Sequence, residues 1–106
     1  MHDDDTHLER HLRESEAHLR RIDDLMARAS QEAARPPRSE PLDALLEEVK
    51  ATRARLAGSL HDLRANLPGG GHPDLVRRGE GLRSDLQRAG SEFEKALTAI
   101  LDTRGV

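Results

Sequence analysis

Imidazole and carboxylate side chains follow one another at helical spacing near the start of the chain, in a pattern that suits metal binding. The row consists of His7, His11, Glu14 and His18, with steps of four, three and four residues. On an α-helix, residues three or four apart share one face. The pairs His7–His11 and Glu14–His18 are therefore close enough to share an ion, whereas His11 and His18 lie about 10.5 Å apart along the axis.

A complete metal site needs ligands from a second helix. Functional zinc and di-metal sites use three or four protein ligands, which in bundles come from more than one helix. If the second and third helical segments pack beside the first, His61 and Glu80 lie at the same height along the bundle as the histidine row. The small residues Ser15, Ser59 and Gly79 fall in the same predicted layer, which leaves room for an ion, for water or for close helix contact. The hypothetical divalent-metal site comprises His7, His11, Glu14, His18, His61 and Glu80.

The competing interpretation makes the row an ordinary solvated flank. Leu12 marks the apolar seam of the segment, so a heptad assignment places His11 and His18 beside that seam and His7 and Glu14 toward solvent. The Glu-x-x-His motif of di-metal bundles does not occur on facing segments. Both interpretations require the row to lie on a helix.

Apolar residues recur at alternating steps of three and four in three segments, which is the pattern of helices that pack side by side. The first seam comprises Leu8, Leu12, Ser15, Leu19, Ile22, Met26, Ala29 and Ala33. The second comprises Leu42, Leu45 or Leu46, Val49, Thr52, Leu56, Ser59 or Leu60, Leu63 and Leu67. The third comprises Leu75, Gly79, Leu82, Leu86, Ala89, Phe93, Leu97 and Ile100 or Leu101.

Capping and breaking residues set the limits of these helices. Thr6 with Glu9 has the sequence of a capping box, and Ser39 or Glu40 is suited to cap the second helix. Prolines 36 and 37 and the segment 68–71 (PGGG) cannot continue a helix. The sequence predicts helices over about 6–35, 40–67 and 73–103. Gly79 and Gly81 each cost about 1 kcal/mol in a helix interior, so we expect a kink or a loosened turn there.

The predicted fold is an all-α, antiparallel up-down-up three-helix bundle that resembles a coiled coil and forms one domain over residues 1–106. Short connections make successive helices antiparallel. Phe93 is the single aromatic residue, and charged residues make up 35% of the chain, so the core must be slender and built from leucine and alanine. The alternative is an oligomer in which a helix or hairpin completes its core with a second chain.

Composition excludes several classes of function. Without cysteine, the chain forms no disulfide and no thiolate site. The net charge is −3, and the chain has neither a basic face nor a platform of aromatic residues on which bases could stack, so nucleic-acid binding is not expected. No apolar run could span a membrane or serve as a secretory signal, so we expect a cytoplasmic protein. Arginine greatly outnumbers lysine, which indicates a bacterial gene of high GC content.

These patterns predict a non-enzymatic helical bundle that acts through protein contacts, as an adaptor, assembly subunit, small inhibitor or chaperone-like partner. The acidic residues lie on helix faces that offer no concave, partly dry site for acid–base catalysis. Apolar residues beside the seams are candidates for contact with a protein partner or a second copy: Leu25, Leu46, Val76 and Leu101. The alternative function is metal binding, storage or sensing through the histidine row and His61. No other cofactor is expected.

Overall fold

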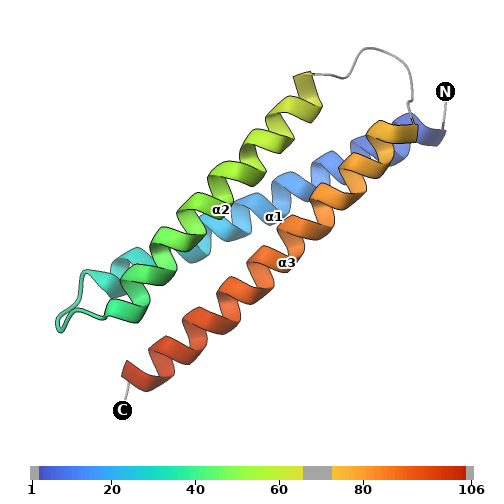
Figure 1. Ribbon diagram of the computed structural model, residues 1–106. Coiled ribbons are helices and arrows are strands. Elements are labelled where there is room, and N and C mark those ends of the chain that lie inside the picture. Colours follow the sequence, from blue (N-terminus) through green and yellow to red (C-terminus); the bar gives the residue numbers. More distant parts are fainter. Residues whose placement is uncertain (1–2, 66–72, 105–106) are drawn as a thin grey trace.

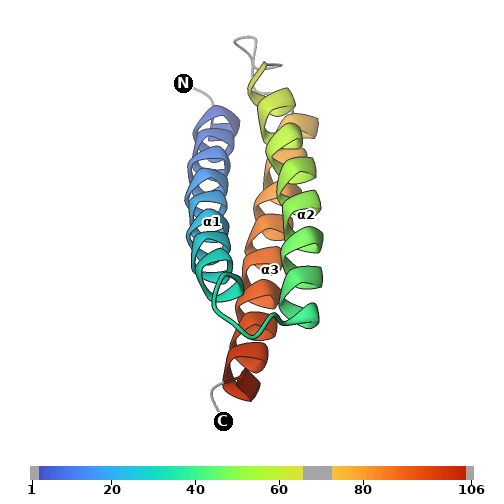
Figure 2. The ribbon, with the colours of Figure 1, turned by 90° about the vertical axis from the view of Figure 1, so that its left-hand side faces the viewer.

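The computed structural model describes residues 3–65 and 73–104, which form three long helices. They are α1 (Asp3–Ala33), α2 (Glu40–Ala65) and α3 (Pro73–Arg104). Helices α1 and α3 run in the same direction, and α2 runs opposite to both (Figures 1 and 2). The bundle is a rod of 55 × 19 × 16 Å, and α1 and α3 form the most extensive contact between two helices. The predicted all-α, up-down-up three-helix architecture is confirmed.

The core follows the heptad seams of the sequence. Its buried residues are Leu8, Leu12, Ile22, Ala29, Leu42, Leu46, Val49, Leu56, Leu60, Leu63, Leu82, Leu86, Phe93 and Leu97. Every one of them is a predicted seam position, because in each helix the apolar stripe faces the other two helices. At the two ambiguous positions of α2, Leu46 and Leu60 are buried, while Leu45 is half-buried and Ser59 is exposed.

Helix boundaries agree with the predictions less well than the core does. Helix α1 begins at Asp3, three residues before the predicted boundary at Thr6. The same helix ends at Ala33, before the predicted boundary at residue 35. The glycine turn and residues 66–67 of the predicted second helix lie outside the described residues.

Ser39 caps α2, as one of the two predicted alternatives. Its Oγ accepts a hydrogen bond of 3.3 Å from the backbone N–H of Leu42. The Ser39 carbonyl accepts the bond that opens the helix, from the N–H of Asp43 at 3.0 Å. Pro41 lies in the first turn, where a backbone N–H has no intrahelical acceptor, so the proline costs the helix no hydrogen bond. These contacts fix the start of α2 directly after the connection from α1.

Replacing Ser39 with alanine is expected to lower the free energy of unfolding by about 1 kcal/mol, because the Leu42 N–H loses its acceptor. Urea-induced unfolding followed by circular dichroism measures the change. Ser30 is exposed in the last turn of α1 and provides the matched control. Ser30→Ala should leave stability unchanged or slightly higher, since alanine has the better helix propensity. Equal effects at both positions would contradict the capping role.

Helix α3 continues through both of its early glycines, so of the predicted kink or loosened turn at Gly79 and Gly81 the loosened turn is wrong. Gly79 is buried against the two other helices. A Cβ on this glycine would lie 2.9 Å from Leu8 Cδ1 and 3.7 Å from Leu63 Cδ2. The packing of α3 against α1 and α2 outweighs the poor helix propensity of glycine, because tertiary contacts supply most of the stability of a helix in a protein.

Candidate functional site

The histidine row of α1 forms part of an ion-pair cluster that includes an arginine of α3. The Nε of Arg83 donates a hydrogen bond of 3.2 Å to His11 Nδ1 and lies 3.3 Å from Glu14 Oε2. The Arg83 side chain is only 24% exposed. A guanidinium, which keeps its positive charge at all physiological pH values, therefore occupies the position between the two groups. A metal ion would have to compete with Arg83 for His11 and Glu14.

The other predicted metal ligands do not join this pair. His7, His61 and Glu80 are exposed, and His18 is half-buried. Within residues 3–65 and 73–104, no three His, Asp or Glu side chains converge as a set of metal ligands. The predicted small-residue layer is also displaced: Gly79 lies level with Leu8 and His11 rather than with Ser15.

Ion pairs join α1 to both of the other helices. Arg21 pairs with Glu94 of α3, and Glu16 pairs with Arg64 of α2. The pairs Arg53–Asp23 and Arg83–Glu14 complete the set of contacts between helices. In the described part of the chain, each of these four ion pairs has one partner on α1, and none joins α2 to α3.

The Asp23–Arg53 pair has the best geometry of the four. Arg53 donates from Nε to Asp23 Oδ1 at 2.7 Å and from Nη2 to Oδ2 at 3.2 Å, which is the bidentate arrangement. These hydrogen bonds raise the pKa of the Arg53 guanidinium above its ordinary value by more than burial lowers it, and the charge of Asp23 adds to the rise. The pair therefore joins α2 to α1 through two parallel hydrogen bonds.

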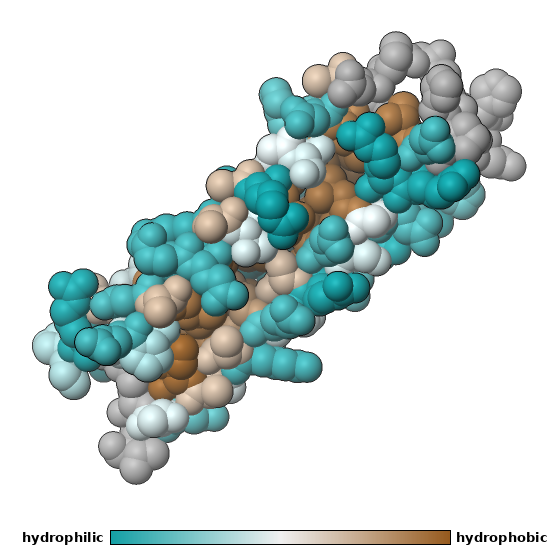
Figure 3. Space-filling model, in the orientation of Figure 1, coloured by the Kyte–Doolittle hydropathy of each residue, from teal (hydrophilic) through white to brown (hydrophobic). Residues whose placement is uncertain are grey.

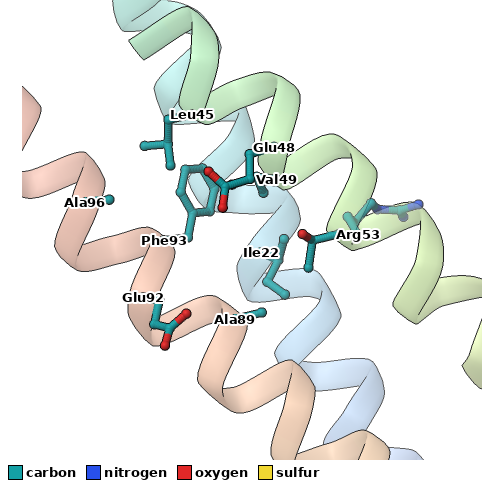
Figure 4. A pocket seen from close by; sticks show the side chains of 10 residues that line it. Ile22, Leu45, Glu48, Val49, Arg53, Ala89, Glu92, Phe93 and Ala96 are labelled. Atoms are coloured by element: carbon teal, nitrogen blue, oxygen red, sulfur yellow. The ribbon is translucent and has the colours of Figure 1, made fainter. Parts of the chain in front are cut away.

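Three hollows follow one another along the seam between α2 and α3. The middle one has a volume of about 220 Å³ and lies between Leu45, Thr52, Ala89 and Phe93, with Ile22 of α1 at its base (Figure 4). A second, of about 210 Å³, continues toward the glycine turn. A third, of about 280 Å³, lies at the end near the proline turn. We call this row of hollows the α2–α3 groove.

Three alanines of α3, Ala89, Ala96 and Ala99, leave the groove open along this helix. Besides Phe93 and Ile100, the residues of α3 that line it follow steps of four and three: Arg78, Leu82, Asp85, Ala89, Glu92, Ala96, Ala99 and Thr103. Side chains as short as alanine cannot bridge to α2, so apolar surface of the core stays accessible between the helices. Figure 3 shows this surface as a band of hydrophobic residues that runs along the molecule between α2 and α3.

Sequence reasoning missed this groove, although a signal for it exists. Ala89 of the predicted seam is followed at steps of seven by Ala96 and Thr103, which lie outside that seam and beside the buried Phe93 and Leu97. A second stripe of small residues next to an apolar seam indicates a helix with two contact faces. Only the larger seam was identified from the sequence.

The predicted partner-binding residues have different surroundings. Leu46 is 7% exposed and belongs to the core, so it is not a surface residue beside the seam, as the partner-binding prediction required. Leu25, Val76 and Leu101 are half-buried and pack against the core cluster. None of the four lines the three hollows of the groove.

Comparisons with known proteins give no relative: no family model, no curated protein and no solved structure matches this chain. Among the helices of the described residues, none is long and apolar enough to cross a lipid bilayer.

Proposed function

We propose that the protein is a non-enzymatic helical-bundle module that binds a helical protein surface at the α2–α3 groove, as an adaptor, assembly subunit, small inhibitor or chaperone-like partner. One observation carries the proposal. The three hollows lie along the helix–helix seam that no ion pair crosses in the described residues, whereas both seams of α1 are bridged by ion pairs.

The chemistry of the groove suits a helical partner. Its base is apolar, with Phe93 buried at 3% exposure and Leu45 and Ile100 half-buried. Its borders carry charged side chains, among them Glu48 and Glu92 beside the middle hollow. An amphipathic helix places an apolar stripe in such a groove and polar residues along its edges. Exposed apolar bands on soluble proteins mark interaction surfaces.

The buried polar chemistry gives no support to catalysis. Ser15 is the one buried polar side chain among the described residues. Its Oγ has no hydrogen-bond partner there. A catalytic serine needs an adjacent base within hydrogen-bond reach. Ser15 is therefore better explained as a small residue that fits a narrow layer of the core.

Site-specific photo-cross-linking tests the proposal in cells of the source organism. We expect a benzophenone amino acid at Ala96 or Ala99, both of which line the groove, to form covalent adducts with protein. The control position is Ala17, which is exposed on α1 and does not line any of the three hollows. Mass spectrometry of the adducts identifies the partner.

Adducts at positions 96 and 99 but not at 17 support docking at the groove. No adduct from either groove position, with folding verified by circular dichroism, would refute the proposed function. Equal labelling from position 17 would also refute it, because the contact would then be unspecific.

A further inference from the structure

We draw no further inference here: the strongest candidate, the middle hollow of the α2–α3 groove with Glu48 of α2 and Glu92 of α3 on its two sides, belongs to the docking site already described, and nothing in the described part of the chain shows what covers it.

Discussion

Replacing Leu86 with alanine is expected to lower the free energy of unfolding by about 2–5 kcal/mol, the range for a buried leucine truncated in a packed core. Leu86 is fully buried, at 0% exposure, in the middle of α3. The rod is only 19 by 16 Å across, so each layer of the core holds few side chains, and the loss of one leaves a cavity that its neighbours cannot fill.

Thermal unfolding followed by circular dichroism measures this effect. One kcal/mol moves the Tm of a small domain by about 4–8 °C, so Leu86→Ala, which costs about 2–5 kcal/mol, should lower the Tm by at least about 8 °C. Leu101→Ala removes the same atoms from a half-buried residue at the end of α3, and its effect should be less than half as large. Equal shifts for the two variants would mean that the core is not centred on Leu86.

Replacing Gly79 with leucine should reduce stability by about 2 kcal/mol in net terms. A Cβ at this position would already lie 2.9 Å from Leu8 Cδ1 and 3.5 Å from His11 Cβ. A leucine side chain would therefore push α3 away from α1, and overpacking of this kind costs about 3 kcal/mol at the upper end of its usual range. The better helix propensity of leucine returns at most about 1 kcal/mol.

Gly81 provides the control for this substitution, because it lies two residues further along the same helix. A Cβ at Gly81 would have no atom within 4 Å, so Gly81→Leu gains helix propensity without crowding and should raise stability by about 1 kcal/mol. Chemical denaturation of both variants gives the difference, which we expect to be about 3 kcal/mol. If both substitutions stabilise the protein, the close contact at Gly79 is not a constraint.

The core could be predicted from the sequence because each helix carries its own apolar stripe. Leu12, Ile22, Leu86 and Leu97 are at heptad positions, and burial of such stripes is the main favourable contribution to the folding free energy of a bundle. The cap at Ser39 was also predictable, because helix capping depends on the residues next to the helix end. A serine just before the first turn has few other roles. Local spacing therefore identified the helices, their inward faces and one of their ends.

The arrangement of the helices around one another was not predictable in the same way. The continuity of α3 through Gly79 depends on how closely Leu8 and Leu63 approach from the other helices, which no local pattern specifies. Whether Leu45 or Leu46 is buried depends on the rotation of α2 about its own axis. The contact of Arg83 with His11 and Glu14 joins residues about seventy positions apart. Other arginines of the chain could have made the same contact, so the sequence does not identify the partner.

The extensive contact between α1 and α3 has a consequence for the order of folding events. It joins residues far apart along the chain, as in the hydrogen bonds Arg21–Glu94 and Arg83–His11, whose partners are separated by 73 and 72 positions. A hairpin of α1 and α2, or of α2 and α3, lacks this contact. The entropy lost in closing so long a loop is recovered only when all three helices are together. The chain should therefore fold in one cooperative step, and neither hairpin should persist by itself as an intermediate.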